Sequence, residues 1–264
     1  MKAMIFAAGL GTRLRPFTDH TPKALIPLAG RPMLERVIER MVRAGVTDLT
    51  INVHHHAQQI VDWLASHRET WPNLDIHVSD ERALLLDTGG GLLHARTYLE
   101  GDEPILVHNA DILTDLDLGA LYRRHLQSGA LATLLVAHRQ TSRYLLMDRD
   151  LRLCGWINRA TGEVRPAGLT YYPLEPAPAD DSASTSCRPT LTEWAFGGVH
   201  VISPTLLQRM DEGGWTGAFS IIPFYLSICR EACIKGYPAP EGTSWFDIGK
   251  PTTLRQAEEW LAAH

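Results

Sequence analysis

Apolar positions along the first 80 residues follow two periods in turn. Apolar or alternating runs over 3–8, 49–53 and 74–78 are typical of buried strands. Between them, 33–44 and the segment around 60–64 place apolar residues three and four positions apart, which is typical of amphipathic helices. This strand–helix–strand–helix–strand order predicts parallel strands with right-handed crossovers and ligand groups at the carboxyl ends of the strands.

The pattern becomes less regular in the second half of the chain. Runs at 104–111, apolar at first and polar at the end, and at 131–136 predict two more strands, with a helix over 116–126 between them. Short apolar stretches separated by turn residues then predict an antiparallel ribbon, and the core resumes near residue 194. The expected elements from 144 onward are strands at 144–148, 153–157, 169–171, 194–202 and 234–237, and helices beginning near 204, 220 and 252. We therefore expect a three-layer α/β/α, Rossmann-like fold with a mixed, mostly parallel sheet and a small β insertion.

Composition limits the classes of protein that fit. The 264 residues are 45% hydrophobic and 21% charged, which suits one large α/β domain. A mean hydropathy of −0.11 and the lack of an apolar run of about 18 residues argue against a membrane span. The formal net charge of −5 argues against nonspecific nucleic-acid binding. No nucleic-acid or membrane partner is expected.

The cysteines and the start of the chain indicate a cytoplasmic location. Met1 and Lys2 lead directly into the first strand, without the features of a signal peptide. The four cysteines lack the paired spacing of metal sites, and Cys229 and Cys233 lie one helical turn apart in an apolar segment. Free thiols in a reducing compartment are the prediction.

A glycine turn with nearby cations ends the first strand. Gly9 and Gly11 permit a sharp turn that brings backbone N–H groups, including that of Ala8, close to an anion. Thr12 adds a hydroxyl donor, and the positive charges of Arg13 and Lys23 follow. A nucleoside triphosphate needs such a set of donors. The alternative is that the two glycines only turn the chain between a strand and a loop.

The glycine turn matches neither of the two common nucleotide-binding loops. Leu14 occupies the place of the third glycine of a dinucleotide fingerprint, and the chain has no Gly-Lys-Ser/Thr sequence. The longer run G-x-G-T-R-x-x-P from Gly9, followed by Pro22-Lys23 and by P-x-x-G-R-P from Pro27, is more specific. It resembles the signature of the sugar-1-phosphate nucleotidylyltransferases, and within them the N-acetylmuramate-1-phosphate uridylyltransferases and the mannose-1-phosphate guanylyltransferase-like proteins. The resemblance is clearest over 1–110 and 195–264.

Two acids far apart in the sequence carry the resemblance further. Asp111 lies at the polar end of the strand expected at 104–111, in Asn109-Ala110-Asp111, where the family usually has Asn-Gly-Asp. Asp247 lies in W-x-D-x-G-x-P, a second family motif. Taken alone, each acid could be a turn or helix-cap residue. The resemblance implies that Asp111 and Asp247 together bind the catalytic Mg²⁺, with Arg13 and Lys23 as catalytic cations.

The resemblance also implies contacts to the two substrates. Asp87 precedes three consecutive glycines, which destabilise a helix by about 0.5–1 kcal/mol each and so indicate a need for bare backbone. The bare backbone serves either a tight turn or contact with a nucleotide base. Thr88 is the expected N-cap of the helix that follows. The nucleotide-binding residues implied are Ala8, Gly9, Gly11, Thr12, Asp87, Gly89, Gly90 and Asn109. Those implied for the sugar are Asn158, Glu193 and Gly198.

Two further segments have a less specific pattern. The histidines at 54–56 follow a strand, and since neighbouring side chains of extended chain point to opposite faces, no metal is assigned there. Residues 173–192 are rich in Pro, Ala, Asp and Ser and should be mobile, either as a surface loop or as a lid over the sugar or a partner contact.

These inferences predict one nucleotidyltransferase domain over 1–264, with a nucleotide-binding half at 1–135 and a sugar-binding half at 136–264. The expected reaction joins a nucleoside triphosphate, with UTP preferred, to a sugar-1-phosphate. The alternatives are guanylyl or thymidylyl transfer to mannose, heptose or glucose 1-phosphate, cytidylyl transfer to choline phosphate, and a non-catalytic nucleotide-sugar sensor. Glycoside hydrolysis leaves the glycine loop and its cations without a role. The chain has no hexapeptide repeats for trimerisation, so a monomer or homodimer is expected.

Overall fold

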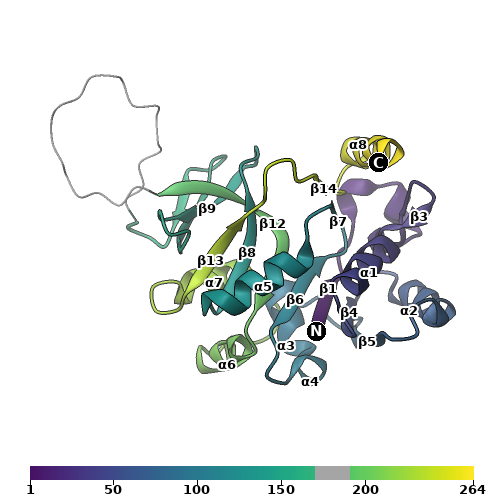
Figure 1. Cartoon of the computed structure of the whole chain (residues 1–264), viewed down its shortest axis with the longest axis horizontal. Helices are drawn as coiled ribbons and strands as arrows, with labels where there is room; N and C mark the ends of the chain where they lie inside the picture. Colours follow the sequence, from purple (N-terminus) through teal and green to yellow (C-terminus); the bar gives the residue numbers. More distant parts are fainter. Residues whose placement is uncertain (170–190) are drawn as a thin grey trace.

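A ten-stranded mixed sheet runs through the protein in the computed structural model, which describes residues 1–169 and 191–264. In spatial order its main path is β11 (Glu163–Arg165), β10 (Leu153–Asn158), β9 (Arg143–Met147), β12 (Thr192–Ile202), β6 (Ile105–Asn109), β1 (Lys2–Phe6), β4 (Asp48–Val53) and β5 (Asp75–Asp80). Beside this path, β8 (Ala132–Ala137) pairs with β12, and β13 (Ile234–Pro238) pairs with β8. Figure 1 shows β6, β8 and β12 near the middle of the molecule.

The half of the sheet built from β6, β1, β4 and β5 is entirely parallel, as the alternating periods predict. The connecting helices of this half are α1 (Met33–Arg43), α2 (Ala57–Ser66), α3 (Asp87–His94) and α4 (Arg96–Leu99). Parallel neighbours require such crossovers, and their carboxyl ends meet at one edge of the sheet. Short 3₁₀ turns, η1 (Thr12–Leu14), η2 (Phe17–Asp19) and η3 (Lys23–Leu25), follow β1, and η4 (Arg68–Thr70) precedes β5.

The long strand β12 joins the parallel half to an antiparallel ribbon. Its last residues lie between β6 and β8, antiparallel to both, and its first residues pair with β9. A change of register between Phe196 and His200 accommodates this change of partner. The predicted mixed sheet with a β insertion is confirmed in β9, β10 and β11. The expected strand at 169–171 is wrong at Leu169, which is outside any strand, while 170–171 and most of the 173–192 segment are outside the described residues.

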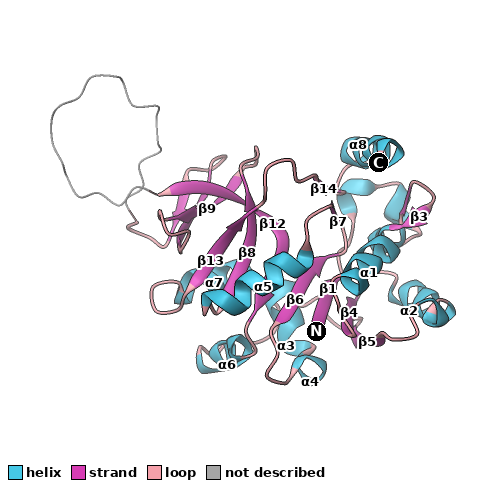
Figure 2. Ribbon diagram, in the orientation of Figure 1, coloured by secondary structure: helices cyan, strands magenta, loops and turns pink. Residues whose placement is uncertain are grey.

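Helices cover both faces of the sheet and complete the three layers (Figure 2). Because side chains of a strand alternate between faces, Ala3 and Ile5 belong to one core cluster and Met4 to the other. The first cluster takes side chains from α1, α2 and α5 (Leu118–Ser128). The second takes them from α3, α4, α6 (Thr205–Glu212) and α7 (Ile221–Ile228). The predicted α/β/α layering is confirmed.

A third, smaller core cluster lies beside these layers. It joins three parts of the chain. The first is a short hairpin of two strands, β2 (Pro27–Leu28) and β3 (Arg31–Pro32), and the second is the ladder of β7 (Ile112–Thr114) and β14 (Trp245–Asp247). The third is the last helix, α8 (Pro251–Ala263). The buried side chains of the cluster include Leu28, Leu113, Ile248 and Leu254. This cluster therefore fixes the position of β7 and β14 relative to the front of the chain.

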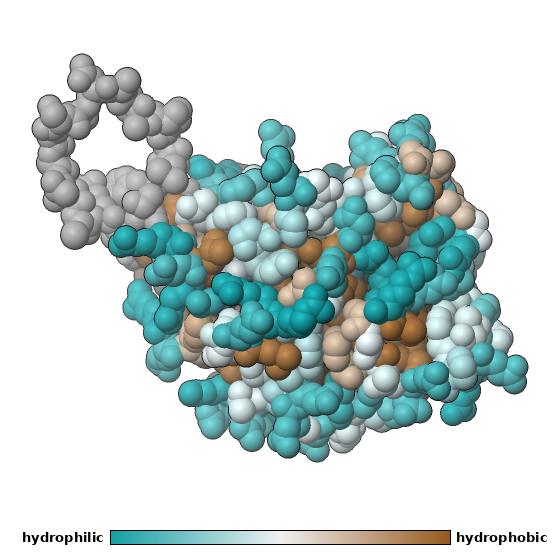
Figure 3. Space-filling model, in the orientation of Figure 1, coloured by the Kyte–Doolittle hydropathy of each residue, from teal (hydrophilic) through white to brown (hydrophobic). Residues whose placement is uncertain are grey.

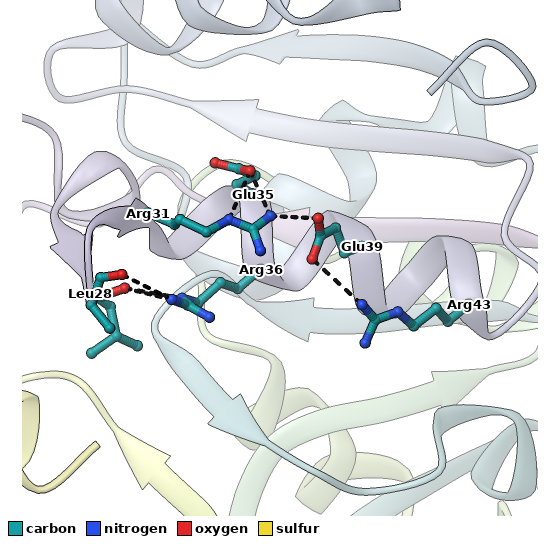
Figure 4. Close-up of polar contacts among 7 residues, drawn as sticks. Leu28, Arg31, Glu35, Arg36, Glu39 and Arg43 are labelled. Carbon is teal, nitrogen blue, oxygen red and sulfur yellow. Dashed lines mark hydrogen bonds and ion pairs between the residues drawn. The ribbon is translucent and has the colours of Figure 1, made fainter. Parts of the chain in front are cut away.

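Polar contacts tie the hairpin to α1 (Figure 4). Arg31 donates to Glu35 Oε1 through Nε at 3.0 Å and also contacts Glu39, and Arg36 donates to the Leu28 carbonyl through Nη2 at 2.8 Å. The backbone N–H of Ala29 donates to Glu258 of α8 at 3.3 Å. Half-exposed ion pairs stabilise weakly, so the apolar cluster supplies most of the docking energy and the charges fix its orientation.

The surface is mostly polar. The face seen in Figure 3 is predominantly hydrophilic, with apolar residues gathered in smaller areas between charged ones. Within residues 1–169 and 191–264, no helix has both the length and the hydropathy that crossing a bilayer requires.

Two histidines are buried inside the sheet. His200 on β12 is 1% exposed, and neither ring nitrogen has a hydrogen-bond partner among the described residues. His108 on β6 is fully buried and contacts the Asn109 carbonyl through Nδ1 at 2.8 Å. Burial lowers the pKa of His200 to about 3 and that of His108 to about 4. Both rings are therefore neutral in the folded protein at pH 7.

The buried histidines predict acid sensitivity of folding. Their folded-state pKa values lie below the unfolded value of 6.5, so the unfolded chain binds protons first as the pH falls. Each histidine should lower the free energy of unfolding by about 1.4 kcal/mol per pH unit between pH 6.5 and its folded pKa. Urea unfolding of wild type and His200→Leu at pH 7.5, 6 and 5 measures this contribution. We expect a shallower loss in His200→Leu, and parallel pH profiles would contradict the assignment.

Candidate active site

A cavity of about 440 Å³ opens at the carboxyl ends of β1, β4 and β6. Its walls include Ala8, Gly9, Lys23, Asn109 and Asp111. The edge where parallel strands end is the place at which α/β folds bind ligands, and the predicted strand order led to this edge. With Asp87, which also lines it, six of the site residues named from the sequence are thus brought together around one space.

The glycine loop forms one wall of this cavity. Ala8 and Gly9 line it, and Gly11 then adopts a φ of 66° that turns the chain into η1. Thr12 and Arg13, within η1, are exposed and lie outside the set of residues lining the cavity. The loop therefore presents backbone to the cavity and extends its polar side chains beyond it.

A buried polar pair, absent from the sequence-based prediction, supports this wall. Asn52 on β4 accepts from the backbone N–H of Ala7 at 2.8 Å and donates to Glu81 Oε1 at 2.7 Å. The other carboxylate oxygen of Glu81 accepts from the Leu86 N–H at 3.1 Å. Asn52 and Glu81 are each 2% exposed and also line the cavity. One buried bridge thus holds both the glycine loop and the segment before α3, and the only sequence signal was an Asn inside an apolar strand.

Lys23 and Asp111 form an ion pair at the floor of the cavity. Lys23, at the start of η3, donates from Nζ to Asp111 Oδ2. Their side chains are 13% and 25% exposed, so water screens this pair only in part. Asp111 directly follows β6 and Ala110, whose N–H donates to the Phe6 carbonyl at 3.0 Å. The cation and the acid named from the sequence are therefore in direct contact.

The two acids are brought to the same place by the β7–β14 ladder. Asp247 lies opposite Ile112 in this antiparallel pair, and the Ile248 N–H donates to the Asp111 carbonyl at 2.8 Å. The backbones of Asp111 and Asp247 are thus neighbours, although most of the sheet lies between them in sequence. Asp247 Oδ1 is buried and has no hydrogen-bond partner in the described part of the chain.

These side chains fit a magnesium ion with few protein ligands. Within the described ranges no three His, Cys, Asp or Glu side chains gather as a metal cage. Mg²⁺ is commonly held by one or two carboxylates, with the remaining ligands from phosphate and water. Two aspartates with neighbouring backbones, one of them with a buried carboxylate oxygen that lacks a partner among the described residues, suit that ion.

Two arginines lie near Asp247. A methyl group placed at Gly249 would be 2.7 Å from Arg13 Nη2 and 2.8 Å from Asp247 Oδ1, so both side chains face this glycine. The second arginine, Arg139, lies with its guanidinium carbon 3.7 Å above the Trp245 ring. Burial lowers the pKa of Arg139, and the negative charge of Asp247 acts in the opposite direction. Arg139 was not named from the sequence.

The segment around α3 differs in part from the prediction. Asp87 lines the cavity with a φ of 59°, and Asn109 lines it as well. The expectation that Thr88 caps α3 is wrong: Thr88 lies within the helix, and its hydroxyl accepts from the Ile221 N–H at 2.9 Å. Gly89 and Gly90 do not line the cavity, and their N–H groups donate to the Phe219 carbonyl at 2.9 and 3.2 Å.

The three residues implied for the sugar lie outside the cavity lining. Asn158 Oδ1 accepts from the Ala160 N–H at 3.0 Å, and Glu193 forms an ion pair with Arg159 at 2.5 Å. Gly198 is closer to the site: it has a φ of 71°, and a methyl group there would lie 2.9 Å from Asn109 Nδ2. Gly198 therefore packs behind the cavity wall, and the other two belong to the ribbon.

Comparisons with known proteins agree with this arrangement. Residues 2–263 match the nucleotidyl transferase family. The chain is 30% identical to an N-acetylmuramate alpha-1-phosphate uridylyltransferase of Caulobacter vibrioides, over 98% of this chain and 96% of that protein. It is 34% identical to a mannose-1-phosphate guanyltransferase of Aspergillus oryzae, over 95% of this chain but only 61% of that protein.

Solved structures show the same fold. HddC from Yersinia pseudotuberculosis superposes with a TM-score of 0.70 at 21% identity, covering 98% of this chain and 99% of that one. A UDP-glucose pyrophosphorylase from Acinetobacter baumanii superposes with a TM-score of 0.71 at 16% identity, covering 97% of this chain and 91% of that one.

The packing of α3 predicts that Gly90 is needed for stability. A methyl group at Gly90 would clash with the Gly217 carbonyl oxygen, a backbone atom that cannot rotate away. Gly90→Ala should therefore lower the free energy of unfolding by about 1–3 kcal/mol through overpacking. Gly119→Ala is the matched control, because Gly119 is also a buried helical glycine but its added methyl would meet only side-chain atoms, Arg123 Nη1 and Asp117 Oδ1, each at 3.1 Å. Equal stabilities of the two variants in thermal or urea unfolding would refute this account.

Proposed function

The chain belongs to the nucleotidyl transferase family, and we propose that it transfers a uridylyl group from UTP to a sugar-1-phosphate, giving a UDP-sugar and pyrophosphate. The class of enzyme, a sugar-phosphate nucleotidylyltransferase, rests on the family match and on the Caulobacter relative. The choice of UTP is supported by that relative, which aligns over nearly its whole length and is named a uridylyltransferase. Guanylyl transfer is the second candidate, favoured by the mannose-1-phosphate guanyltransferases at similar identity.

The observation that supports this function most strongly is the contact of Lys23 with Asp111 in the cavity wall, beside which the β7–β14 ladder holds the backbone of Asp247, although Asp247 itself is not among the lining residues. Phosphate groups of two substrates repel each other, and a site that joins them must supply positive charge and fixed positions. The nucleophile, a phosphate oxygen of the sugar-1-phosphate, is already an anion, so no general base is required.

The chemistry assigned to the chain is positioning and electrostatic stabilisation. The attacking oxygen forms a bond to the α-phosphorus as the bond to the pyrophosphate oxygen breaks. In this proposal the backbone from Ala8 to Thr12 donates to the triphosphate, and Arg13 stabilises the leaving pyrophosphate. Once Lys23 no longer contacts Asp111, it holds the α-phosphate or the sugar phosphate. Mg²⁺ held by Asp111 and Asp247 supplies further neutralisation of phosphate charge when bound.

The two halves of the chain divide the substrates in this proposal. Residues 1–135 bind the nucleotide through the glycine loop, Asp87, Asn109 and the backbone near Gly89 and Gly90. The N–H groups of these two glycines must first release the Phe219 carbonyl to which they donate. Residues 136–264 bind the sugar, with Gly198 the nearest of the three implied residues. The cytoplasmic location and the monomeric or homodimeric state stay predictions.

Pyrophosphate release, measured with five nucleoside triphosphates against a panel of sugar-1-phosphates, tests the proposed function. We expect the highest kcat/KM with UTP and a hexosamine-type sugar-1-phosphate such as N-acetylmuramate 1-phosphate. A preference for GTP with mannose 1-phosphate would select the second candidate. A thermal shift with nucleotide but no pyrophosphate from any pair would contradict the proposed activity.

Asp111→Asn should lose about two to four orders of magnitude in kcat, the range seen when one key electrostatic group is removed. The fold should persist, because the amide keeps the shape of the carboxylate. Asp247→Asn is expected to behave in the same way. Asp117→Asn is the control: Asp117 caps α5 through Oδ1, and Asn caps as well as Asp. Near-normal turnover by Asp111→Asn, with Mg²⁺ as the only divalent ion, would reject the role of Asp111.

A further inference from the structure

Arg139 lies at the same edge of the sheet as the acids. It follows β8 by two residues, and β8 and β6 are both antiparallel to β12. β8 and β6 therefore run in the same direction, and their carboxyl ends, which carry Arg139 and Asp111, lie at one edge of the sheet. Arg139 is on the far side of β12 from the glycine loop, which follows β1.

Two contacts hold the Arg139 side chain in one orientation, and a third fixes the ring on which it stacks. Its guanidinium carbon is 3.7 Å above the ring of Trp245, and its Nη2 donates to the Phe196 carbonyl at 2.8 Å. Trp245 is itself fixed, because its Nε1 donates to the Gly197 carbonyl at 2.8 Å. Trp245 and Asp247 are two positions apart on β14, so their side chains share one face of that strand.

The same side chain keeps unused donor capacity. Arg139 Nε is buried and has no hydrogen-bond partner among the described residues, and Arg139 forms no ion pair within that part of the chain. The charge of Asp247 acts on this partly buried guanidinium without an ion pair, and a buried Nε that lacks a hydrogen-bond partner is unfavourable. Stacking on Trp245 and a hydrogen bond to the Phe196 carbonyl do not neutralise the guanidinium, so its positive charge can attract an anion that enters the site.

We propose that Arg139 binds the phosphate group of the sugar-1-phosphate, as a substrate-binding residue of the acceptor side. This inference rests on the proposed function. The triphosphate side of the site already has the glycine loop, Arg13 and Lys23 for its charges. Arg139 lies across β12, stacked on Trp245 and on the side of the β9–β11 ribbon, away from the glycine loop. Its free Nε edge and its charge match a phosphate oxygen.

A structural role predicts different behaviour. If Arg139 only fixed Trp245 and the Phe196 carbonyl, its loss would lower stability and kcat and would affect both substrates alike. A phosphate-binding role predicts a selective loss of affinity for the acceptor. The KM of each substrate, measured separately, distinguishes these two roles.

Arg139→Met, which keeps the length and apolar contact of the side chain, should raise the KM for the sugar-1-phosphate by about tenfold to hundredfold. The KM for the nucleoside triphosphate should change by less than about threefold. Arg139→Lys should lie between wild type and Arg139→Met, because it keeps the charge but not the fork of donors. Equal rises in both KM values, or no rise in either, would overturn the proposal.

Arg96→Met is the matched control. Arg96 is also partly buried and donates to a backbone carbonyl, that of Leu207 at 3.1 Å, but it lies by α4 and α6, away from β14 (Figure 1). Both KM values should stay at wild-type levels in this variant. Thermal unfolding of all variants identifies any that fold poorly. If Arg139→Met is one of them, the KM values of Arg139→Lys are compared with those of wild type instead.

Inorganic phosphate as a competitive inhibitor against the sugar-1-phosphate identifies the group that Arg139 contacts. Its inhibition constant should rise in Arg139→Met in parallel with the acceptor KM. A raised acceptor KM with unchanged phosphate inhibition would place Arg139 on the sugar ring instead and overturn the phosphate assignment. Wild-type turnover of any sugar-1-phosphate separates these outcomes from a failure of the proposed function itself.

Discussion

The site depends on one short antiparallel ladder. The three residue pairs between β7 and β14 place Asp247 opposite Ile112 and bond the Ile248 N–H to the Asp111 carbonyl. The backbones of two acids far apart in the sequence become neighbours through this ladder. Three pairs alone would be marginal in water. The ladder persists because Leu113 and Ile248 are buried, together with Leu28 and Leu254, in the third core cluster. The terminal helix and the β2–β3 hairpin, neither of which lines the cavity, thereby help to determine where the acids lie.

Charge is arranged locally against the trend of the whole chain. The protein has a formal net charge of −5, yet Arg13, Lys23 and Arg139 converge on the two acids. Two carboxylates carried by neighbouring stretches of backbone repel each other, and the repulsion grows as water is excluded. Each acid is offset differently: Asp111 by direct contact with Lys23, and Asp247 by arginines that approach it without forming an ion pair within the described residues. The site is therefore balanced enough to fold while retaining carboxylate oxygens and cations for ligands.

The sequence predicted what depends on local spacing. Helical and strand periods gave α1, β4 and the parallel half of the sheet, and the strand order placed Asp111 at the ligand edge before any coordinates. Features that depend on contacts between distant segments were beyond it. The bridge from Asn52 to Glu81 and the stacking of Arg139 on Trp245 need two partners that no local period relates. Thr88 shows the same limit, because its hydroxyl bonds to α7 rather than capping its own helix.

The three glycines of α3 show how a correct observation can have two causes. Their presence did indicate a need for bare backbone, and the structure supplies a partner for it: the Phe219 carbonyl accepts from both Gly89 and Gly90. A methyl group at Gly91 would also lie 2.8 Å from Glu81 Oε1, within the bridge that supports the glycine loop. The helix start is thus packed between the segment before α7 and the cavity wall. A base that contacted these two N–H groups would have to displace the Phe219 carbonyl. A base could instead bind beside Asp87 and Thr88, which already line the cavity. The second route needs no rearrangement of the backbone, so the helix start serves first as the rigid wall against which the nucleotide side of the cavity is built.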